Sequence, residues 1–419
     1  MRPVTPRGFR DVLVAEASER RCIARAVEAS FESAGYGLVE TPVLEMSRSL
    51  EAGAGSSLEG RALLVQDTDG SLLALRPEMT VPIARLVASR LADMDGPKRL
   101  AYVADVFREQ ASLRGQARQF TQAGVELIGV GGPAADAEVV TVLVSALEVC
   151  GLEDFTVAVG TVAVLRALLD ATGADEGWRL TVLGAAHRRD LVEFAQLVTG
   201  AGLDRAVERA LLRVPRIRGG AEALARARAL VAPCGCGAAV DDLARTIELL
   251  EAAGVSQRVS VDFGIMRDFD YYTGLIVEAY APGLGVPLGG GGRYDGVLAA
   301  FDAAAPAAGF ALGIDRLHIA LADQGRLPVV RGLDAVVGGA DVSSILATCT
   351  RLRTHGWRVV PAPDAPRAEL PRLALKSSAE CALWAQGTLL GLLAPDGALA
   401  GALDPDDLPA PPSLEGSSS

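Results

Sequence analysis

An apolar stripe at helical spacing opens the chain. Between Ala15 and Gly35 it consists of Ile23, Val27 and Phe31, each four residues after the last. Apolar positions at this interval share one face of an α-helix, and a glycine just beyond them is a typical C-cap. The pattern therefore predicts an amphipathic helix over 15–35.

Short apolar runs separated by turn signals predict strands in the next part of the chain. The runs 63–67 and 71–76 flank Asp69-Gly70, a pair typical of a hairpin turn. The runs 100–106 and 124–130 are joined by a polar loop, which predicts an antiparallel pair. Further predicted elements are an edge strand over 37–44 that contains Pro42, strands at 156–159, 259–263, 275–279 and near 311, a helix from its N-cap Thr80 to Leu91, and helices over 136–150 and 314–322.

The remaining patterns divide the chain into parts. Residues 161–254 have helical periodicity and no convincing strand, which predicts a helical insertion in a core that spans 1–325. A β-α-β order at 334–337, 342–354 and 357–360 predicts a small α/β domain over 329–408. The Pro/Ser-rich tail 409–419 is expected to be disordered. Together these elements predict an α+β fold, with an antiparallel sheet flanked by helices.

Composition narrows the class of protein. The 419 residues contain no apolar run of the ~20 residues that a bilayer span needs, and no signal peptide, so we expect a cytoplasmic protein without membrane contact. The net charge of −12 disfavours nucleic-acid binding. Six scattered cysteines indicate reduced thiols, and neither a metal nor a cofactor is expected, although Cys234-Gly-Cys236 leaves half a metal site open.

One basic stripe has two interpretations. Arg205, Arg209 and Arg213 lie four residues apart, on one face of a predicted helix. They could dock RNA or a protein partner. A solvated charged face is the interpretation that we favour.

Charged and aromatic residues cluster in three later segments. An arginine at a strand end, such as Arg108, can clamp a carboxylate or phosphate through two hydrogen bonds, and a neighbouring aromatic such as Phe120 can stack on a flat ring. Four glycines at 289–292 let a backbone approach a ligand closely, although a mere loop is the alternative. In the third segment, Arg316 at a helix start could be a purely structural cation.

Five of these charges are expected on one face of the sheet: Glu78, Arg108, Glu126, Arg267 and Arg316. Burying so many charges is costly unless a ligand or mutual pairing compensates them.

Residues 5 to 325 resemble the class II aminoacyl-tRNA synthetase core, in its histidyl-tRNA synthetase branch. The segment 37–45 resembles motif 1, the dimer-interface strand, while 107–126 and 309–317 resemble motifs 2 and 3. The segments 267–274 and 289–296 resemble the two histidine-specific motifs, which are far more specific.

This resemblance implies roles for individual residues. Those at positions that hold the amino group and imidazole of histidine are Glu78, Thr80, Gln122, Glu126, Tyr271 and Tyr272. Arg108 and Arg267 match the arginines that neutralise the α-phosphate and the carboxylate. Phe120 and Arg316 match the adenine-stacking aromatic and the γ-phosphate arginine.

Departures from the synthetase pattern change the implied function. Met79 replaces a glycine beside the ligand, Gln110 a carboxylate, Gln116 an arginine and Thr121 a histidine. Loss of one transition-state charge contact typically costs ~10²–10³-fold in rate, so activation of histidine should be weak or absent. In the C-terminal segment 370–408, Arg372 and Lys376 are the only basic residues, which leaves little to hold an anticodon loop.

With these departures the chain resembles the regulatory-subunit family of short-form ATP phosphoribosyltransferase, the first enzyme of histidine biosynthesis. The resemblance implies a noncatalytic protein that binds histidine, dimerises through the motif 1-like strand and pairs with a separate short-form catalytic subunit. Two alternatives stay open, namely an active histidyl-tRNA synthetase and a stand-alone histidine sensor.

Overall fold

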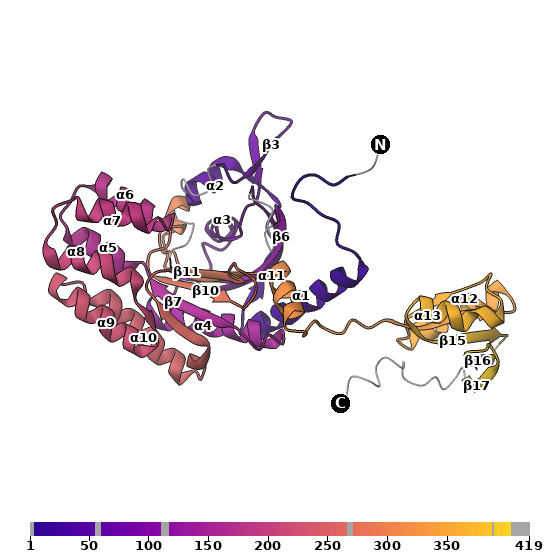
Figure 1. Cartoon of the computed structure of the whole chain (residues 1–419). Coiled ribbons are helices and arrows are strands. Elements are labelled where there is room, and N and C mark those ends of the chain that lie inside the picture. Colours follow the sequence, from indigo (N-terminus) through magenta and orange to yellow (C-terminus); the bar gives the residue numbers. More distant parts are fainter. Residues whose placement is uncertain (1–3, 55–59, 110–116, 266–270, 388, 404–419) are drawn as a thin grey trace. The chain divides into compact units, whose positions relative to one another are not determined.

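The computed structural model describes residues 4–54, 60–109, 117–265, 271–387 and 389–403 (Figure 1). The chain forms two compact units, Met1–Pro328 and Val329–Ser419. Over the described residues, no helix combines the length and apolarity needed to span a membrane. The predicted disorder of 409–419 concerns residues outside those described.

A nine-stranded sheet forms the centre of the first unit, and six neighbouring strands from β5 to β7 run antiparallel. Its strands, in spatial order, are β1 (Gly37–Leu38), β5 (Lys98–Phe107), β6 (Gln119–Ile128), β12 (Ala307–Gly313), β11 (Gly289–Arg293), β10 (Leu275–Tyr280), β7 (Thr156–Thr161), β9 (Val259–Asp262) and β8 (Arg218–Gly219). The predicted antiparallel pair is confirmed, although β6 begins five residues before the predicted 124. The α+β fold with an antiparallel sheet is likewise confirmed.

Helices cover this sheet (Figure 1). They are α1 (Val14–Ser33), α4 (Gly132–Val149), α10 (Ala238–Ala252) and α11 (Ile314–Asp323). The predicted stripe of α1 is buried, and its Phe31 meets Phe310 of β12 edge-on with ring centroids 5.7 Å apart. Gly35 follows the helix with a φ of +83°, a conformation that favours glycine. This first predicted helix is therefore confirmed.

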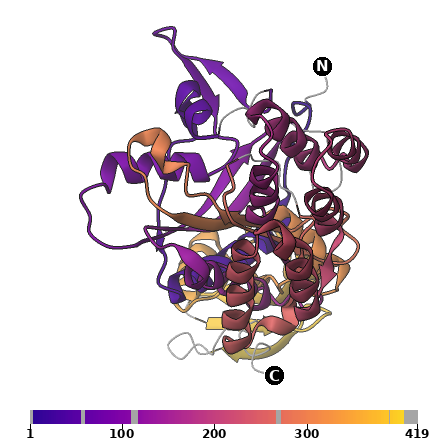
Figure 2. The same ribbon diagram turned by 90° about the vertical axis from the view of Figure 1, so that its left-hand side faces the viewer.

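A small three-stranded sheet rises beside the large one (Figure 2). Its spatial order is β2 (Leu44–Met46), β4 (Leu72–Leu75) and β3 (Leu63–Gln66), and α2 (Ser47–Ala54) follows β2. The hairpin predicted at Asp69-Gly70 is confirmed. The single strand predicted over 37–44 is wrong, because the chain leaves the large sheet after Leu38 and enters the small sheet at Leu44. Between them, the carbonyl of Thr41 accepts a hydrogen bond from Nη1 of Arg76 at 2.6 Å.

The segment between β7 and β9 is mainly helical (Figure 2). It contains α5 (Ala163–Ala171), α6 (Glu176–His187), α7 (Leu191–Thr199), α8 (Arg205–Arg213), α9 (Ala221–Val231) and α10. Asp175, Asp190 and Asp204 cap α6, α7 and α8, each accepting a backbone N–H of the first turn. The expectation of no strand here is wrong, since the two-residue β8 pairs with β9.

The second unit is built on a five-stranded sheet in the order β14-β13-β15-β16-β17. Its elements are β13 (Leu333–Gly339), α12 (Val342–Thr354), β14 (Val359–Pro361), α13 (Leu370–Lys376), β15 (Ala379–Gln386), β16 (Leu389–Leu393) and β17 (Leu399–Leu403). The predicted β-α-β order is confirmed, with β13 and β14 parallel. The last three strands were not predicted. Short 3₁₀ turns complete the chain at Val214–Arg216, Ala232–Cys234, Ser256–Arg258, Leu298–Phe301 and Arg367–Glu369.

Candidate functional site

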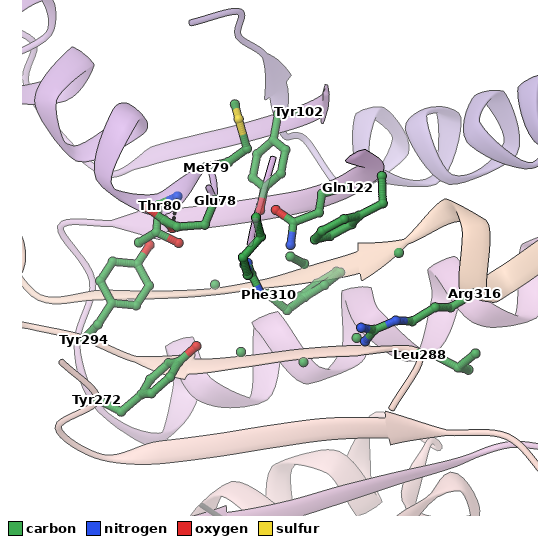
Figure 3. A pocket seen from close by; sticks show the side chains of 18 of the residues that line it. Glu78, Met79, Thr80, Tyr102, Gln122, Tyr272, Leu288, Tyr294, Phe310 and Arg316 are labelled. Atoms are coloured by element: carbon green, nitrogen blue, oxygen red, sulfur yellow. Dashed lines mark hydrogen bonds between the residues drawn. The ribbon is translucent and has the colours of Figure 1, made fainter. Parts of the chain in front are cut away.

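A cavity opens over the middle of the large sheet, at the start of α3 (Thr80–Arg90) (Figure 3). It contains about 620 Å³ of empty space, including its open mouth. Of the residues nominated from the sequence, those that line it are Glu78, Met79, Thr80, Arg108, Phe120, Gln122, Tyr271, Tyr272 and Arg316. Glu126 lies just beneath, bonded to Thr80. Arg267 is outside the described residues.

Glu78 organises the start of α3. Its carboxylate accepts the backbone N–H of Thr80 at 2.6 Å and that of Val81 at 2.9 Å. The prediction that Thr80 caps this helix is therefore wrong, because the longer side chain of Glu78 reaches both free N–H groups. Burial raises the pKa of the Glu78 carboxyl, while these backbone N–H groups and Arg108 oppose the rise.

Glu126 is a carboxyl buried in the floor, with 1% of its surface exposed. Oγ1 of Thr80 donates to its Oε1 at 2.9 Å, and the hydroxyl of Tyr294 donates to its Oε2. Burial raises the pKa of Glu126 to about 8 and the nearby Glu78 adds to this, although both hydroxyls pull it down. Near neutral pH this carboxyl therefore holds a proton that a cationic ligand could displace.

Three tyrosines form one wall of the cavity. The ring centroids of Tyr271 and Tyr272 are 4.9 Å apart, and those of Tyr271 and Tyr294 are 5.9 Å apart. Burial raises the pKa of Tyr271 and of Tyr294 well above the usual value, so both phenols are neutral donors. In Figure 3, the hydroxyl of Tyr272 points into the cavity. This wall suits a flat ring that carries hydrogen-bonding nitrogens.

Two arginines and a glutamine supply polar contacts on the other side. Nη2 of Arg108 donates to the carbonyl of Pro77 at 2.9 Å, and its guanidinium lies 5.5 Å from the ring centroid of Phe120. Nη1 of Arg316 donates to the carbonyl of Pro287 at 2.7 Å. Oε1 of Gln122 is buried without a hydrogen-bond partner among the described residues. A buried acceptor of this kind calls for a donor, which a ligand can provide.

The glycine run forms the bare floor of the cavity. It is the central strand β11, with Gly289, Gly290 and Gly291 in the lining. A β-carbon on Gly291 would lie 1.9 Å from the carbonyl oxygen of Gly309 in the neighbouring strand β12. The alternative of a mere loop is therefore wrong, and backbone without side chains leaves the space above it open.

Four lining residues with large side chains were not nominated from the sequence: Tyr102, Leu288, Tyr294 and Phe310. Tyr294 lies within a segment already singled out, directly after the glycine strand. Tyr102 and Phe310 meet at Gly124, where a β-carbon would lie 2.5 Å from the Tyr102 hydroxyl. Alternation along β5 was the available signal for Tyr102, because successive side chains of a strand point to opposite faces.

Comparison with known proteins places the chain. Residues 8–317 match the family model described as histidyl-tRNA synthetase. The chain is 41% identical over 355 residues to a protein of Moorella thermoacetica named ATP phosphoribosyltransferase regulatory subunit, an alignment that covers 85% of this chain and 91% of that protein. The chain belongs to the family of ATP phosphoribosyltransferase regulatory subunits.

Solved structures agree with this family. One from Bacillus halodurans, described as an ATP phosphoribosyltransferase regulatory subunit/histidyl-tRNA synthetase, has a TM-score of 0.80 and 31% identity, covering 92% of this chain and 98% of that one. A histidyl-tRNA synthetase from Nostoc has a TM-score of 0.77 at 20% identity, covering 94% and 95%. The second likeness shows that this chain shares the synthetase fold.

Two of the residues that depart from the synthetase pattern, Met79 and Thr121, lie in different surroundings in this regulatory-subunit family member. Met79 is 1% exposed, and in Figure 3 its side chain runs away from Tyr294 and Tyr272. Met79 belongs to the hydrophobic core and also lines the cavity, so the expectation that its bulk borders the ligand stays a prediction. Thr121 turns to the other face of β6, where its hydroxyl donates to Asp105 at 2.7 Å. Gln110 and Gln116 lie outside the described residues.

Two other sequence features lie away from the cavity. Arg205, Arg209 and Arg213 are exposed on α8. Sγ of Cys236 donates to the carbonyl of Cys234 at 3.3 Å. Among the residues that the structure describes, no group of three or more His, Cys, Asp or Glu could hold a metal ion.

Proposed function

We propose that this chain is a noncatalytic, cytoplasmic regulatory subunit of ATP phosphoribosyltransferase that binds histidine and confers histidine control on a separate short-form catalytic subunit. Two observations together carry the proposal. A relative named as a regulatory subunit matches 85% of the chain, and the cavity of this chain keeps a buried polar set around Glu126. A family member that had lost all ligand binding would have no need of this costly set.

The chemistry of the cavity fits histidine. The ammonium group and the imidazole N–H are donors, and Glu126, Glu78 and Gln122 offer acceptors within one cavity or directly beneath it. The carboxylate of the histidine ligand could accept two hydrogen bonds from one arginine guanidinium. The proposed histidine-binding residues are Glu78, Met79, Thr80, Arg108, Gln122, Glu126, Arg267, Tyr271 and Tyr272.

Loss of catalysis is the second part of the proposal. The motif 2-like segment has Gln110 and Gln116 where the synthetase pattern has charges, so the groups that would position ATP are reduced. Phe120 and Arg316 are proposed as remnants of the nucleotide site. Arg316 donates to the carbonyl of Pro287, which engages part of its guanidinium within the protein.

The assembly is the third part. β1 is an edge strand of the large sheet and β2 an edge strand of the small one, and Leu38, Val43 and Leu44 of this segment are at least 40% exposed. Large apolar side chains gathered at a sheet edge suit a protein interface. We therefore place self-dimerisation on the motif 1-like segment.

The second unit completes the proposal. We assign 329–408 as a degenerate anticodon-binding-like domain that no longer holds RNA. Arg372 and Lys376 are the only basic residues in 370–408, and nucleic-acid affinity depends on neutralising phosphates.

Two measurements test the proposed function. The chain, co-expressed with a short-form catalytic subunit, should elute with it as one complex on size-exclusion chromatography, and separate elution would refute the partnership. The purified chain should also give no histidine-dependent exchange of pyrophosphate into ATP, with an authentic histidyl-tRNA synthetase as the positive control. Clear exchange would establish the synthetase alternative instead.

A further inference from the structure

Near the start of β6, the side chains on one face line the cavity, and the side chain on the other face bonds to β5. Phe120 and Gln122 line the cavity. Thr121, between them, points to the opposite face, where its hydroxyl donates to Oδ1 of Asp105 on β5 at 2.7 Å. Successive side chains of a strand alternate between faces, so any group that fixes Thr121 also fixes both of its cavity-lining neighbours.

Asp315 fixes the backbone of Thr121. β12 pairs with β6 only as far as Gly313, opposite Gln122, and then turns into α11. One residue beyond that point, the N–H of Thr121 donates to Oδ2 of Asp315 at 3.1 Å. The carboxylate thus takes the place of the carbonyl that a longer β12 would offer. A hydrogen bond to an ionised acceptor is stronger than a neutral one.

The same bond also ties in Arg316. This residue follows Asp315 in the first turn of α11 and lines the cavity. The bond between Thr121 and Asp315 therefore fixes Arg316 relative to Gln122. Without it, the start of β6 and the start of α11 could separate, since β12 pairs with β6 only up to Gly313 and Gln122.

Arg20 of α1 forms an ion pair with Asp315 on the face of β6 that is opposite the cavity. Its Nη2 lies 2.8 Å from Oδ1 of Asp315 and donates to Oγ1 of Thr121 at 3.5 Å. The side chains of Arg20 and Asp315 are only 15% and 14% exposed, so water screens the pair weakly. A second link between the same helices joins His318 to Glu19 at 2.7 Å.

We infer that Asp315 and Arg20 are positioning residues for the ligand cavity: they touch no ligand, but they set histidine affinity by holding β6 and α11 in register. This inference rests on the proposed function, because histidine is the ligand whose affinity is set. It also connects the cavity to α1, since a displacement of Arg20 is passed through Asp315 to Gln122 and Arg316.

Calorimetric titration of L-histidine into the full chain tests the inference. Asp315→Asn and Arg20→Gln should each weaken binding about tenfold, because each removes a charge-assisted contact. The double variant should bind no more weakly than the weaker single variant, since both act through one link. Arg20→Lys keeps the charge but not the planar fork, and should fall between wild type and Arg20→Gln.

A matched variant separates positioning from general stability. Arg99 of β5 bonds Glu138 of α4 at 2.7 and 2.8 Å, a sheet-to-helix ion pair that involves no residue lining the cavity. Arg99→Gln should therefore leave histidine affinity within about twofold of wild type, a change within the usual effect of a remote surface pair. Equal weakening by Arg99→Gln would overturn the inference.

The remaining outcomes are distinct. Asp315→Asn and Arg20→Gln variants that bind histidine as tightly as wild type would overturn the inference alone and leave the proposed function standing. A wild-type chain that fails to bind histidine would refute histidine binding, and the inference would fall with it.

Discussion

A β-carbon on Gly309 would lie 1.9 Å from Oε2 of Glu126. The two residues are opposite one another in the pairing of β12 with β6. The same carboxyl oxygen accepts the hydroxyl of Tyr294, so it cannot move aside without losing that bond. Position 309 must therefore be glycine for the carboxyl of Glu126 to fit beneath the cavity.

Gly309→Ala should displace Glu126 and weaken histidine binding more than any remote glycine substitution. Overpacking of a filled core costs about 1–3 kcal/mol, and a loss of about 3 kcal/mol in the free energy of unfolding is expected here. Gly237→Ala is the control, since nothing lies within 4 Å of its β-carbon position. Urea unfolding and calorimetric titration measure the two effects. Equal stability of both variants would contradict the account.

The raised pKa of Glu126 predicts a pH dependence of stability. Its pKa rises from the usual 4.5 to about 8 in the folded state. Between these values the folded protein holds a proton that the unfolded chain has released. The contribution of this carboxyl to the free energy of unfolding is therefore complete below pH 4.5. It falls by roughly 1.4 kcal/mol per pH unit as the pH rises from there, and it is lost once the pH has risen through 8.

Glu126→Gln should flatten this decline, because the amide does not titrate. The measurement is the free energy of unfolding from pH 5 to pH 8, compared as slopes rather than as absolute values. Glu251→Gln, at an exposed position in the last turn of α10, is the control and should keep the wild-type slope. A Glu126→Gln variant with the wild-type slope would argue against proton uptake by this carboxyl.

The proposed dimer predicts an effect at the motif 1-like segment. Val43 is 43% exposed beside the edge strand, and Val43→Asp should shift the chain from dimer to monomer because it buries a charge in the interface. Leu180→Asp on α6, at a site 60% exposed, is the matched control and should stay dimeric. Sedimentation equilibrium measures the outcome. A Val43→Asp variant as dimeric as wild type would place the interface elsewhere.

Periodicity predicted the main helices and most strands of the large sheet, because their apolar faces are buried against one core. Periodicity failed where a contact with another residue, rather than the local sequence, determines the structure. Thr80 is a standard N-cap residue, yet Glu78 caps α3 from two positions earlier. The run 37–44 has a β-like sequence throughout. Nevertheless, Arg76 donates a hydrogen bond to the carbonyl of Thr41, and the chain passes from the large sheet to the small one there.

The candidate site followed a similar division. Motif resemblance nominated most of the lining residues, because those motifs lie on strands whose ends meet. Glycine has low strand propensity, so no pattern could reveal that 289–293 is a central strand. The apolar stretch after Leu370 carried no clear period, and β15, β16 and β17 were missed for that reason.

The central claim is that histidine bound to this chain controls a separate catalytic subunit. The most direct measurement is the ATP phosphoribosyltransferase activity of the assembled complex across a histidine titration, with Glu126→Gln complexes measured in parallel. The account predicts that activity falls as histidine is added to the wild-type complex, and that inhibition of the variant needs higher histidine concentrations. Full activity of the wild-type complex at saturating histidine would contradict it.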